Sequence, residues 1–298
     1  MSTADLSGLV IAIFGPTASG KTAVAEAIAD AIPAEVISAD SMQVYEGLPI
    51  LTNQPARPAA LVAVWPLDYE SSVGEYQRLA HAAVDDALAG GRTPVVVGGT
   101  GLYLRAALAD LRLPPAPPPG TRERWERLYD RLGPEQAHAV LAERDPQAAE
   151  AVHANDRKRL VRALELHEAG GSLAPPRDRL WSDETRHPTV IFGLDVPKTV
   201  LDQRIRDRTE AMFERGVEGE VERALQAPLS RTASQIIGLR EVADLQREEA
   251  VDAIARRTRR YGAYQRKWMR RIPALQMVSA DRPAKETAAE ILARAQPA

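Results

Sequence analysis

The amino-acid sequence predicts an α/β fold in which a mostly parallel sheet is interrupted by a helical insertion. Short apolar runs alternate with helical patterns, a glycine-rich turn joins the first run to the first helix, and a proline-rich segment breaks the alternation. Strands that alternate with helices are typical of parallel sheets covered on both faces. The chain has 298 residues, 45% of them apolar and 27% charged, which are ordinary values for a globular protein.

Four short apolar runs are predicted to form strands. The first, residues 9–14 (LVIAIF), is rich in β-branched residues, as expected of a buried parallel strand. It leads through a turn at residues 15–20 into an alanine-rich helix at residues 21–31. The other predicted strands are residues 35–38, 94–97 and 190–196. From residue 198 onward the pattern is mainly helical.

A proline-rich segment marks a boundary in the chain. Residues 113–120 (LPPAPPPG) contain five prolines and cannot form a helix or a central strand. Residues 121–171 have a charged, helical pattern, and residues 174–188 are irregular before the sheet pattern resumes. We therefore expect a core built from residues 1–113 and 188–298, with a helical insertion at residues 114–187.

The turn after the first strand carries the most specific motif. It matches the pattern G-x-x-x-x-G-K-[ST] in full. Its residues are Gly15, Pro16, Thr17, Ala18, Ser19, Gly20, Lys21 and Thr22. In such a loop the backbone N–H groups and the start of the helix face phosphate oxygens, and the lysine adds a positive charge. A hydroxyl at Thr22 suits a magnesium ion that bridges to the phosphates. The alternative is a plain strand-to-helix turn.

The loop alone does not identify the phosphate compound. Enzymes that hydrolyse ATP or GTP normally have a second strand ending in an aspartate that helps hold the metal. Two predicted strands end near such a residue, Asp40 and Asp195. The strand 94–97 instead leads into the glycine-rich residues 98–101, where we expect the backbone to approach a ligand closely. The sequence predicts a P-loop NTPase-like sheet without indicating NTP hydrolysis.

Four segments together resemble a known family. They are GPTASGKT at residues 15–22, ISADSMQVY at 37–45, GGTGLY at 98–103 and RLVRALE at 159–165. The combination is similar to that of the tRNA dimethylallyltransferases, also called isopentenyl-tRNA transferases. The resemblance extends from about residue 10 to about residue 271.

The resemblance implies an activity. Members of this family transfer a dimethylallyl group from dimethylallyl diphosphate to N6 of adenosine 37, next to the anticodon of tRNA, and require Mg²⁺. The P-loop, although its pattern is that of an ATP-binding site, is then expected to hold the diphosphate of the donor. Arg208 is implied as a second clamp on the diphosphate, with Arg204 and Arg206 close by in the sequence.

The amine of adenine is a weak nucleophile, so the reaction needs a proton acceptor. The resemblance assigns that role to Asp40, which follows a predicted strand. The alternative is a turn-forming or helix-capping aspartate. Thr100 is expected to touch the leaving oxygen or the amine, unless it is an ordinary turn residue. Residues expected to contact the base or the tRNA are Asp40, Ser41, Met42 and Gln43, and Gln43 can read an adenine edge. Tyr45 is equally compatible with base contact and with core packing.

A base must leave its stack before N6 can be alkylated, so a surface that holds RNA is expected. One candidate is the run Lys158, Arg159, Leu160, Val161 and Arg162, preceded by Arg157. The other is residues 256–271, which contain eight Lys or Arg, no acid, and the aromatics Tyr261, Tyr264 and Trp268. Basic side chains among aromatics suit looped RNA, although charged runs are also common on solvated helix faces.

One segment departs from the usual pattern of the family. Asn53 and Gln54 stand where the family usually has a small residue and a lysine.

Other features bear on the alternative functions. An adenylate isopentenyltransferase shares the loop but needs neither the insertion nor the basic segment, and the GGTGLY segment argues against a small-molecule kinase. A non-catalytic RNA-binding module is the third alternative. With no cysteine and a net charge of −3, we expect a monomeric cytoplasmic protein without disulfides or zinc–thiolate sites.

Overall fold

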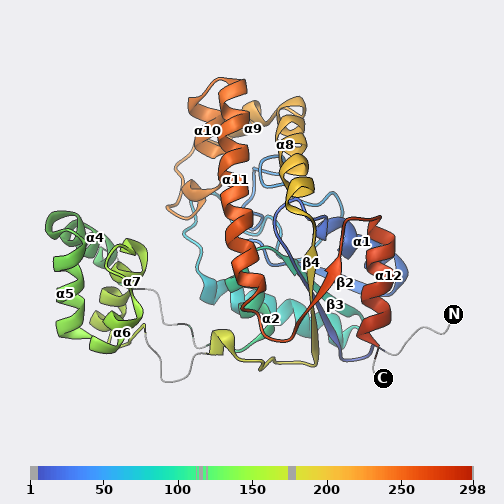
Figure 1. The fold of residues 1–298 in the computed structure, drawn as a ribbon, viewed down its shortest axis with the longest axis horizontal. Helices are drawn as coiled ribbons and strands as arrows, with labels where there is room; N and C mark the ends of the chain where they lie inside the picture. Colours follow the sequence, from blue (N-terminus) through green and yellow to red (C-terminus); the bar gives the residue numbers. More distant parts are fainter. Residues whose placement is uncertain (1–5, 112, 114–116, 119, 174–178, 297–298) are drawn as a thin grey trace. The chain divides into compact units, whose positions relative to one another are not determined.

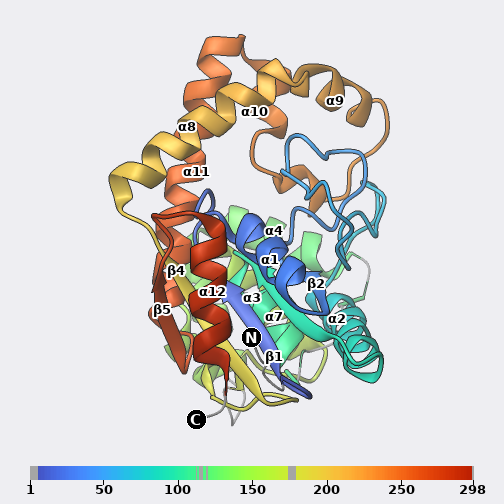
Figure 2. The ribbon, with the colours of Figure 1, turned by 90° about the vertical axis from the view of Figure 1, so that its right-hand side faces the viewer.

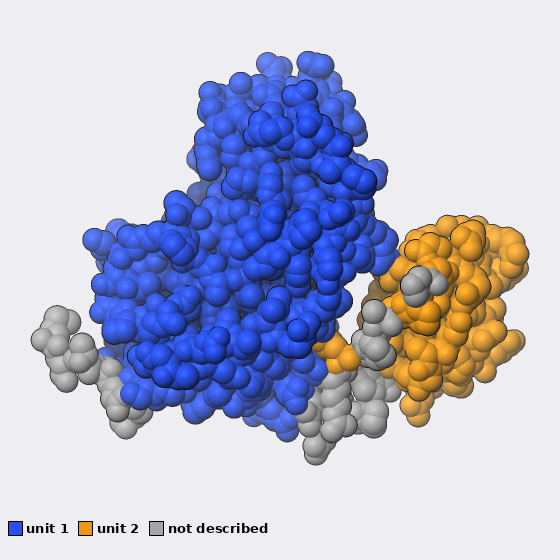
Figure 3. Space-filling model, turned by 180° about the vertical axis from the view of Figure 1, so that it is seen from behind, with its two compact units in different colours: residues 1–111, 183–298 blue, residues 112–182 orange. Residues whose placement is uncertain are grey.

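A computed structural model describes residues 6–111, 113, 117–118, 120–173 and 179–296. The chain forms two compact units, one comprising Met1–Leu111 and Asp183–Ala298 and the other Arg112–Ser182 (Figure 3). The predicted insertion, residues 114–187, differs from the second unit by two residues at its start and five at its end. Parts of the predicted proline-rich and irregular segments, residues 114–116, 119 and 174–178, lie outside the described residues.

The first unit contains a five-stranded sheet in which every pair of neighbouring strands is parallel. The strand order is β2-β3-β1-β4-β5. The strands are β1 (Val10–Phe14), β2 (Ala34–Ser38), β3 (Thr93–Gly98), β4 (Thr189–Asp195) and β5 (Leu275–Ser279). The four predicted strands are confirmed to within one residue at each end. The fifth was not predicted, because it lies at the sheet edge and only Val278 is fully buried, so it lacks a continuous apolar run.

Helices cover both faces of this sheet (Figure 1). They are α1 (Lys21–Ala31) and α12 (Ala284–Ala295) on one face, and α2 (Val73–Ala89) and α3 (Gly101–Leu108) on the other. On the first face, alternate strand residues such as Ile11 and Ile13 pack against Val24, Ile28 and Ile291. The P-loop joins β1 to α1 at the carboxyl edge of the sheet, where ligands of open α/β sheets bind.

A group of helices extends beyond the carboxyl ends of the strands. These are α8 (Lys198–Glu214), α9 (Val217–Ala224), α10 (Leu239–Asp244) and α11 (Arg247–Met269). The long helices α8 and α11 lie side by side, with α9 and α10 near their far end (Figure 2). No helix in the described part of the chain is long and apolar enough to cross a membrane.

The second unit is helical, consisting of α4 (Thr121–Leu132), α5 (Pro134–Arg144), α6 (Pro146–Ala151) and α7 (Arg157–Glu168). Asp145 and Asp156 accept hydrogen bonds from N–H groups in the first turns of α6 and α7, which fixes where these helices begin. The unit has its own apolar core, to which Trp125, Leu141 and Leu160 contribute. It therefore buries apolar surface independently of the sheet.

Candidate active site

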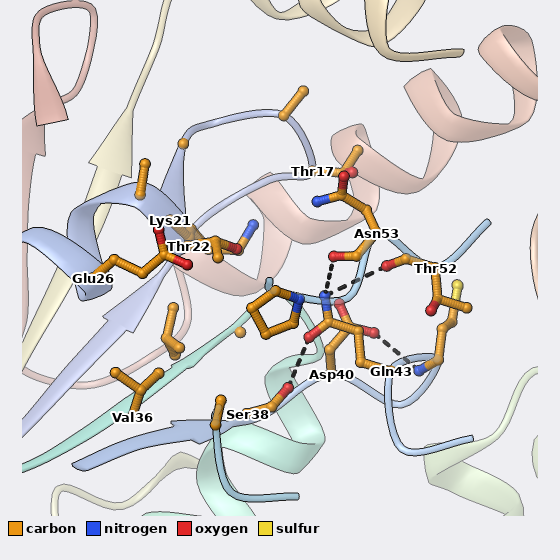
Figure 4. A pocket seen from close by; sticks show the side chains of 18 of the residues that line it. Thr17, Lys21, Thr22, Glu26, Val36, Ser38, Asp40, Gln43, Thr52 and Asn53 are labelled. Atoms are coloured by element: carbon orange, nitrogen blue, oxygen red, sulfur yellow. Dashed lines mark hydrogen bonds between the residues drawn. The ribbon is translucent and has the colours of Figure 1, made fainter. Parts of the chain in front are cut away.

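A cavity of about 550 Å³ lies in the first unit, at the carboxyl edge of the sheet. The P-loop and α1 form one wall, and residues around 38–59 form the wall opposite (Figure 4). Residues of β2 and β3, among them Val97 and Gly98, also line the cavity, and helices α8 and α11 contribute Arg204, Arg208, Met212, Ile254, Thr258, Tyr261 and Gln265. The cavity thus joins the predicted phosphate loop to the predicted catalytic aspartate, Asp40.

The P-loop has the geometry of a phosphate cradle. Gly20 adopts a left-handed conformation (φ 87°) at the start of α1, which a residue with a side chain rarely adopts. The first N–H groups of α1 have no partners within the helix and are available to an anion. The Lys21 ammonium donates a hydrogen bond to the Pro16 carbonyl at 2.8 Å, within the loop itself. Ser19 Oγ is buried and has no hydrogen-bond partner among the described residues.

Two cations of the cavity have no ion-pair partner among the described residues. Burial lowers the pKa of Lys21 to about 8; the charge of Asp40 opposes this change and the charge of Arg208 adds to it. Burial likewise lowers the pKa of the Arg208 guanidinium, although Asp40 opposes that shift too. The Nε atom of Arg208 is buried without a hydrogen-bond partner. An anionic ligand would supply the partner that both cations lack.

Asp40 combines the two roles that the sequence left open. Its Oδ1 atom accepts a hydrogen bond from the Met42 N–H at 2.9 Å, which is the geometry of an aspartate that closes a turn. The same side chain lines the cavity, and its Oδ2 atom has no hydrogen-bond partner among the described residues. One oxygen therefore fixes the carboxylate while the other remains available to a ligand.

The amide of Gln43 is already engaged within the protein. Its oxygen accepts from Ser38 Oγ at 2.9 Å, and its nitrogen donates to the Asn53 carbonyl at 2.8 Å (Figure 4). Gln43 lines the cavity, but reading an adenine edge would require it to exchange these bonds. Tyr45 is fully buried and its hydroxyl is hydrogen-bonded to Ser71 and Thr232. Of the two alternatives for Tyr45, the structure shows core packing.

Thr100 lies behind the cavity rather than in its lining. Its hydroxyl accepts from the Ser41 N–H at 3.2 Å and is hydrogen-bonded to the Tyr261 hydroxyl at 3.3 Å. It therefore holds the turn that follows Asp40. A contact with the leaving oxygen or the amine, as predicted, would need a rearrangement of these bonds.

The glycines at residues 98–99 were expected to let a ligand approach closely; Gly98 lines the cavity, and close packing within the protein also requires glycine at both positions. A Cβ atom on Gly98 would lie 2.0 Å from the Ala39 carbonyl oxygen. A Cβ atom on Gly99 would lie 2.2 Å from the side-chain nitrogen of Gln265. Both positions are crowded by the protein itself, so the glycines permit β3 to pack against neighbouring segments.

The residues that sequence reasoning missed lie on α11, which was interpreted only as an RNA-binding segment. Thr258, Tyr261 and Gln265 are uncharged and follow one another at helical spacing, so they share one face of an otherwise basic helix. That face lines the cavity. Their spacing within a run of arginines was the signal that could have identified them.

The loop at residues 50–54 is held by a buried carboxylate from α9. The two carboxylate oxygens of Glu220 accept hydrogen bonds from the N–H groups of Ile50 and Leu51, each at 2.8 Å. Asn53 has a left-handed backbone (φ 53°), which asparagine tolerates better than most residues. Gln54 donates to the Tyr45 carbonyl at 2.8 Å. The two residues that depart from the family pattern thus have structural partners of their own.

The predicted RNA-binding residues of α7 divide into exposed and buried sets. Lys158 and Arg159 are exposed. Leu160 and Val161 are fully buried in the core of the second unit, so their side chains cannot reach RNA. Arg162 forms an ion pair with the buried carboxylate of Glu165. Leu160 and Val161 were included in the predicted RNA-binding run only because basic residues flank them in the sequence. The prediction that their side chains contact RNA is therefore wrong.

The basic residues of α11 divide in the same way. Arg257 pairs with Glu241, and Arg266 donates to the Val196 carbonyl. The exposed residues Arg256, Arg260, Lys267 and Arg270 have no ion-pair partner in the described part of the chain. These four recur at helical spacing, and Tyr264, whose exposed fraction is 55%, lies among them. We refer to these five residues as the basic stripe.

Comparison with known proteins identifies relatives along most of the chain. The IPP transferase family matches residues 43–272, and the isopentenyl transferase family matches residues 8–59. A tRNA dimethylallyltransferase from Thermobifida fusca is 40% identical over 293 residues, covering 92% of this chain and 91% of the relative.

Solved structures are similar over a comparable length. The tRNA isopentenylpyrophosphate transferase from Bacillus halodurans is 30% identical, with a TM-score of 0.66, covering 97% of this chain and 98% of its own. A eukaryotic dimethylallyltransferase acting on tRNA is 24% identical, with a TM-score of 0.77, covering 98% of this chain and 81% of its own. This last likeness concerns the fold alone.

Proposed function

The chain belongs to the IPP transferase family of tRNA dimethylallyltransferases, and from that membership we propose how its own residues carry out the transfer. The enzyme moves a dimethylallyl group from dimethylallyl diphosphate to N6 of adenosine 37 in tRNA, and diphosphate is released. One observation carries the residue assignment. The P-loop, the unpaired cations Lys21 and Arg208, and the available oxygen of Asp40 line the same cavity.

The donor side of the reaction is assigned to the P-loop and α8. The bond between C1 of the dimethylallyl group and the diphosphate oxygen breaks, so negative charge accumulates on the leaving diphosphate. Lys21, Arg208 and the N–H groups at the start of α1 stabilise that charge, because a buried cation interacts strongly with an anion in a water-poor site. Binding the diphosphate should also raise the pKa of Lys21 and so keep its ammonium charged at higher pH.

The acceptor side is assigned to Asp40. As N6 bonds to C1, the amine nitrogen becomes positive and must lose a proton. The Oδ2 atom of Asp40 accepts that proton, while Oδ1 stays hydrogen-bonded to the Met42 N–H and keeps the carboxylate oriented. Ser41, Met42 and Gln43 follow on the same turn, and we assign them to the seat of the extruded base.

Magnesium fits the residues present. Thr22 lines the cavity and would offer a hydroxyl oxygen, the kind of atom that this ion prefers. Among the described residues no group of three or more His, Cys, Asp or Glu could hold a metal ion. This pattern suits an ion held by Thr22 and by diphosphate oxygens rather than by a protein cage. When bound, Mg²⁺ neutralises part of the charge of the leaving diphosphate.

Two surfaces are proposed to hold tRNA. On the second unit, the exposed residues Lys158 and Arg159 of α7 contact the anticodon arm, and the insertion serves as an RNA-gripping domain. On the first unit, the basic stripe of α11 contacts the phosphate backbone, with Tyr264 as a stacking residue. In both cases the argument rests on cations that are exposed rather than engaged in ion pairs.

The proposal is tested with an unmodified anticodon stem-loop bearing adenosines at positions 36–38. The loop is incubated with the protein, Mg²⁺ and dimethylallyl diphosphate, beside parallel samples that contain AMP or ATP. Mass spectrometry should show one added dimethylallyl unit on the RNA and none on AMP. Digestion to nucleosides should place it on N6 of adenosine 37.

Other outcomes identify the alternatives. Transfer to AMP only would make the protein an adenylate isopentenyltransferase. ATP turnover without prenyl transfer would make the P-loop an ordinary nucleotide site. RNA binding without any turnover would leave a non-catalytic RNA-binding module.

A further inference from the structure

The side chain of Gln265 joins two loops that are far apart in the sequence. Gln265 lies on α11 and is 2% exposed. Its oxygen accepts a hydrogen bond from the N–H of Thr17, in the P-loop, at 2.7 Å. Its nitrogen donates to the carbonyl of Gly99, after β3, at 2.9 Å. One amide therefore links the phosphate cradle to the segment that contains Thr100.

That second segment leads directly to Asp40. Thr100 follows Gly99, and its hydroxyl accepts from the Ser41 N–H, next to Asp40. The path Thr17–Gln265–Gly99–Thr100–Ser41 thus connects the loop assigned to the donor with the turn assigned to the base. Each contact along it is a hydrogen bond or a peptide bond, so a shift of one loop is resisted by the other.

The surrounding residues are shaped for this contact. Gly99 has no room for a side chain, because a Cβ atom would lie 2.2 Å from the Gln265 nitrogen. Trp268 crowds Gly101 in the same manner. Gly99 and Gly101 therefore accommodate the contact between α11 and the segment that follows β3.

We propose that Gln265 is a positioning residue that sets the distance between the diphosphate cradle and the catalytic turn of Asp40. This inference rests on the proposed function. The amide of glutamine suits this role, because one side of it accepts a hydrogen bond and the other donates one. Alignment of the reacting groups matters, since a misplacement of about 1 Å reduces the rate by roughly 10²-fold.

The test uses two substitutions of Gln265. Leucine removes both hydrogen bonds, whereas glutamate keeps the acceptor for Thr17 but sets a carboxylate oxygen against the Gly99 carbonyl. We expect Q265L to weaken the binding of inorganic diphosphate with Mg²⁺ roughly tenfold and to lower the single-turnover transfer rate roughly 100-fold. Q265E places a carboxylate in the wall of the cavity, so it should bind diphosphate more weakly and transfer slowly at pH 8.

A pH series separates positioning from simple stability. A protonated carboxylic acid both donates and accepts, as the amide does, and burial raises the pKa of a carboxyl group. The transfer rate of Q265E, relative to the unmodified protein, should therefore rise as the pH is lowered. The ionisable side chains Lys21, Asp40, Arg208 and Tyr261 line the same cavity and are present in both proteins, so the ratio of the two rates compensates for their contribution. All rates are measured well below the melting temperature of each variant.

Gln77→Leu is the matched control, because Gln77 binds the N–H and carbonyl of Leu111 with its amide in the same two-sided way, outside the cavity. Its diphosphate affinity should be unchanged despite a similar loss of thermal stability. The proposal is overturned if Q265L, still folded, binds diphosphate and transfers at the unmodified rate, or if the Q265E ratio does not change with pH. If the unmodified protein transfers no prenyl group, the proposed function fails, while the diphosphate measurements still report on the link to the P-loop.

Discussion

The two walls of the cavity differ in whether their polar groups already have partners within the protein. On the phosphate wall, by which we mean the P-loop with α1 and the adjoining Arg208 of α8, both cations lack an ion-pair partner among the described residues, and burial lowers the pKa of Lys21 and of Arg208. On the opposite wall, Gln43 is hydrogen-bonded at both ends of its amide and Glu220 holds the loop at residues 50–54. One wall retains unneutralised charge, and the other is fixed in shape before a ligand arrives.

This difference matches what each wall is proposed to recognise. Diphosphate is a small, highly charged anion, and unpaired cations are the strongest means of binding it. A flipped base is large, neutral and planar, so a preformed surface lowers the entropy lost when it binds. Asp40 is the exception on the second wall, since its Oδ2 atom has no partner there. The predictions below address this contrast, from the largest expected effect to the smallest.

Replacing Asp40 by asparagine tests the exception. Asparagine keeps an oxygen for the Met42 N–H but cannot accept a proton, so the single-turnover transfer rate should fall by about 10²- to 10⁴-fold. Diphosphate affinity should be retained or increased, because a negative charge near Lys21 and Arg208 is removed. A rate within about threefold of the unmodified protein would exclude Asp40 as the base.

Replacing Lys21 by methionine tests the phosphate wall. Diphosphate binding, measured by calorimetry with Mg²⁺, should weaken about 10²-fold, because a buried charge interaction is lost. The ligand-free variant should be more stable by about 1–3 kcal/mol, since burying an ammonium whose pKa falls from 10.5 to about 8 disfavours folding near neutral pH. A variant that is both less stable and unaltered in diphosphate binding would contradict this assignment.

The pKa of Lys21 also gives the diphosphate affinity a pH dependence. Below pH 8 the ligand-free lysine is charged, and above it the lysine becomes neutral and must take up a proton when diphosphate binds. Affinity for diphosphate should therefore fall as the pH rises from 8 to 9, by up to about tenfold.

The free energy of unfolding should change with pH in the opposite direction. From about pH 8 to 10.5 the unfolded chain binds more protons at this site, so Lys21 makes the folded state more stable as pH rises. Lys21→Met should remove both trends.

Replacing Glu220 by glutamine tests the fixed wall. The amide offers one acceptor to two N–H groups, so one of them loses its partner and the loop at residues 50–54 loosens. We expect kcat/KM for the stem-loop to fall roughly tenfold, with diphosphate affinity unchanged. Glu222→Gln, an exposed change on the same helix, is the control. Equal effects on diphosphate and on RNA would show that the two walls are not independent.

The smallest effect is expected on α11, where the engaged and unengaged cations lie on one helix. Arg260→Ala removes an exposed cation of the basic stripe and should weaken stem-loop binding a few-fold, with a salt dependence reduced by about one unit in slope. Arg257→Ala removes a cation that is paired with Glu241 and should leave that slope unchanged. Equal slopes in the two variants would remove the basic stripe from the RNA surface.

Local sequence signals predicted the elements whose reasons are local. The first four strands were identified because they are continuous apolar runs, and the P-loop because its glycines and lysine form a contiguous motif. The edge strand β5 was missed because only one of its residues is fully buried. The sequence located the basic runs but did not show which of their cations are unpaired. An ion pair such as Arg257–Glu241 joins residues that only the folded chain brings together.

The sequence by itself determined four of the five strands, the phosphate loop and the family resemblance, because each is read from short segments of residues that are neighbours in the chain. Only the tertiary structure decided which groups around the cavity are engaged and which are available. The bond from Thr17 to Gln265 joins residues separated by 248 positions, and that from Leu51 to Glu220 joins residues separated by 169. Such bonds depend on how α9 and α11 pack beyond the sheet, and no local pattern of apolar or charged residues encodes that geometry.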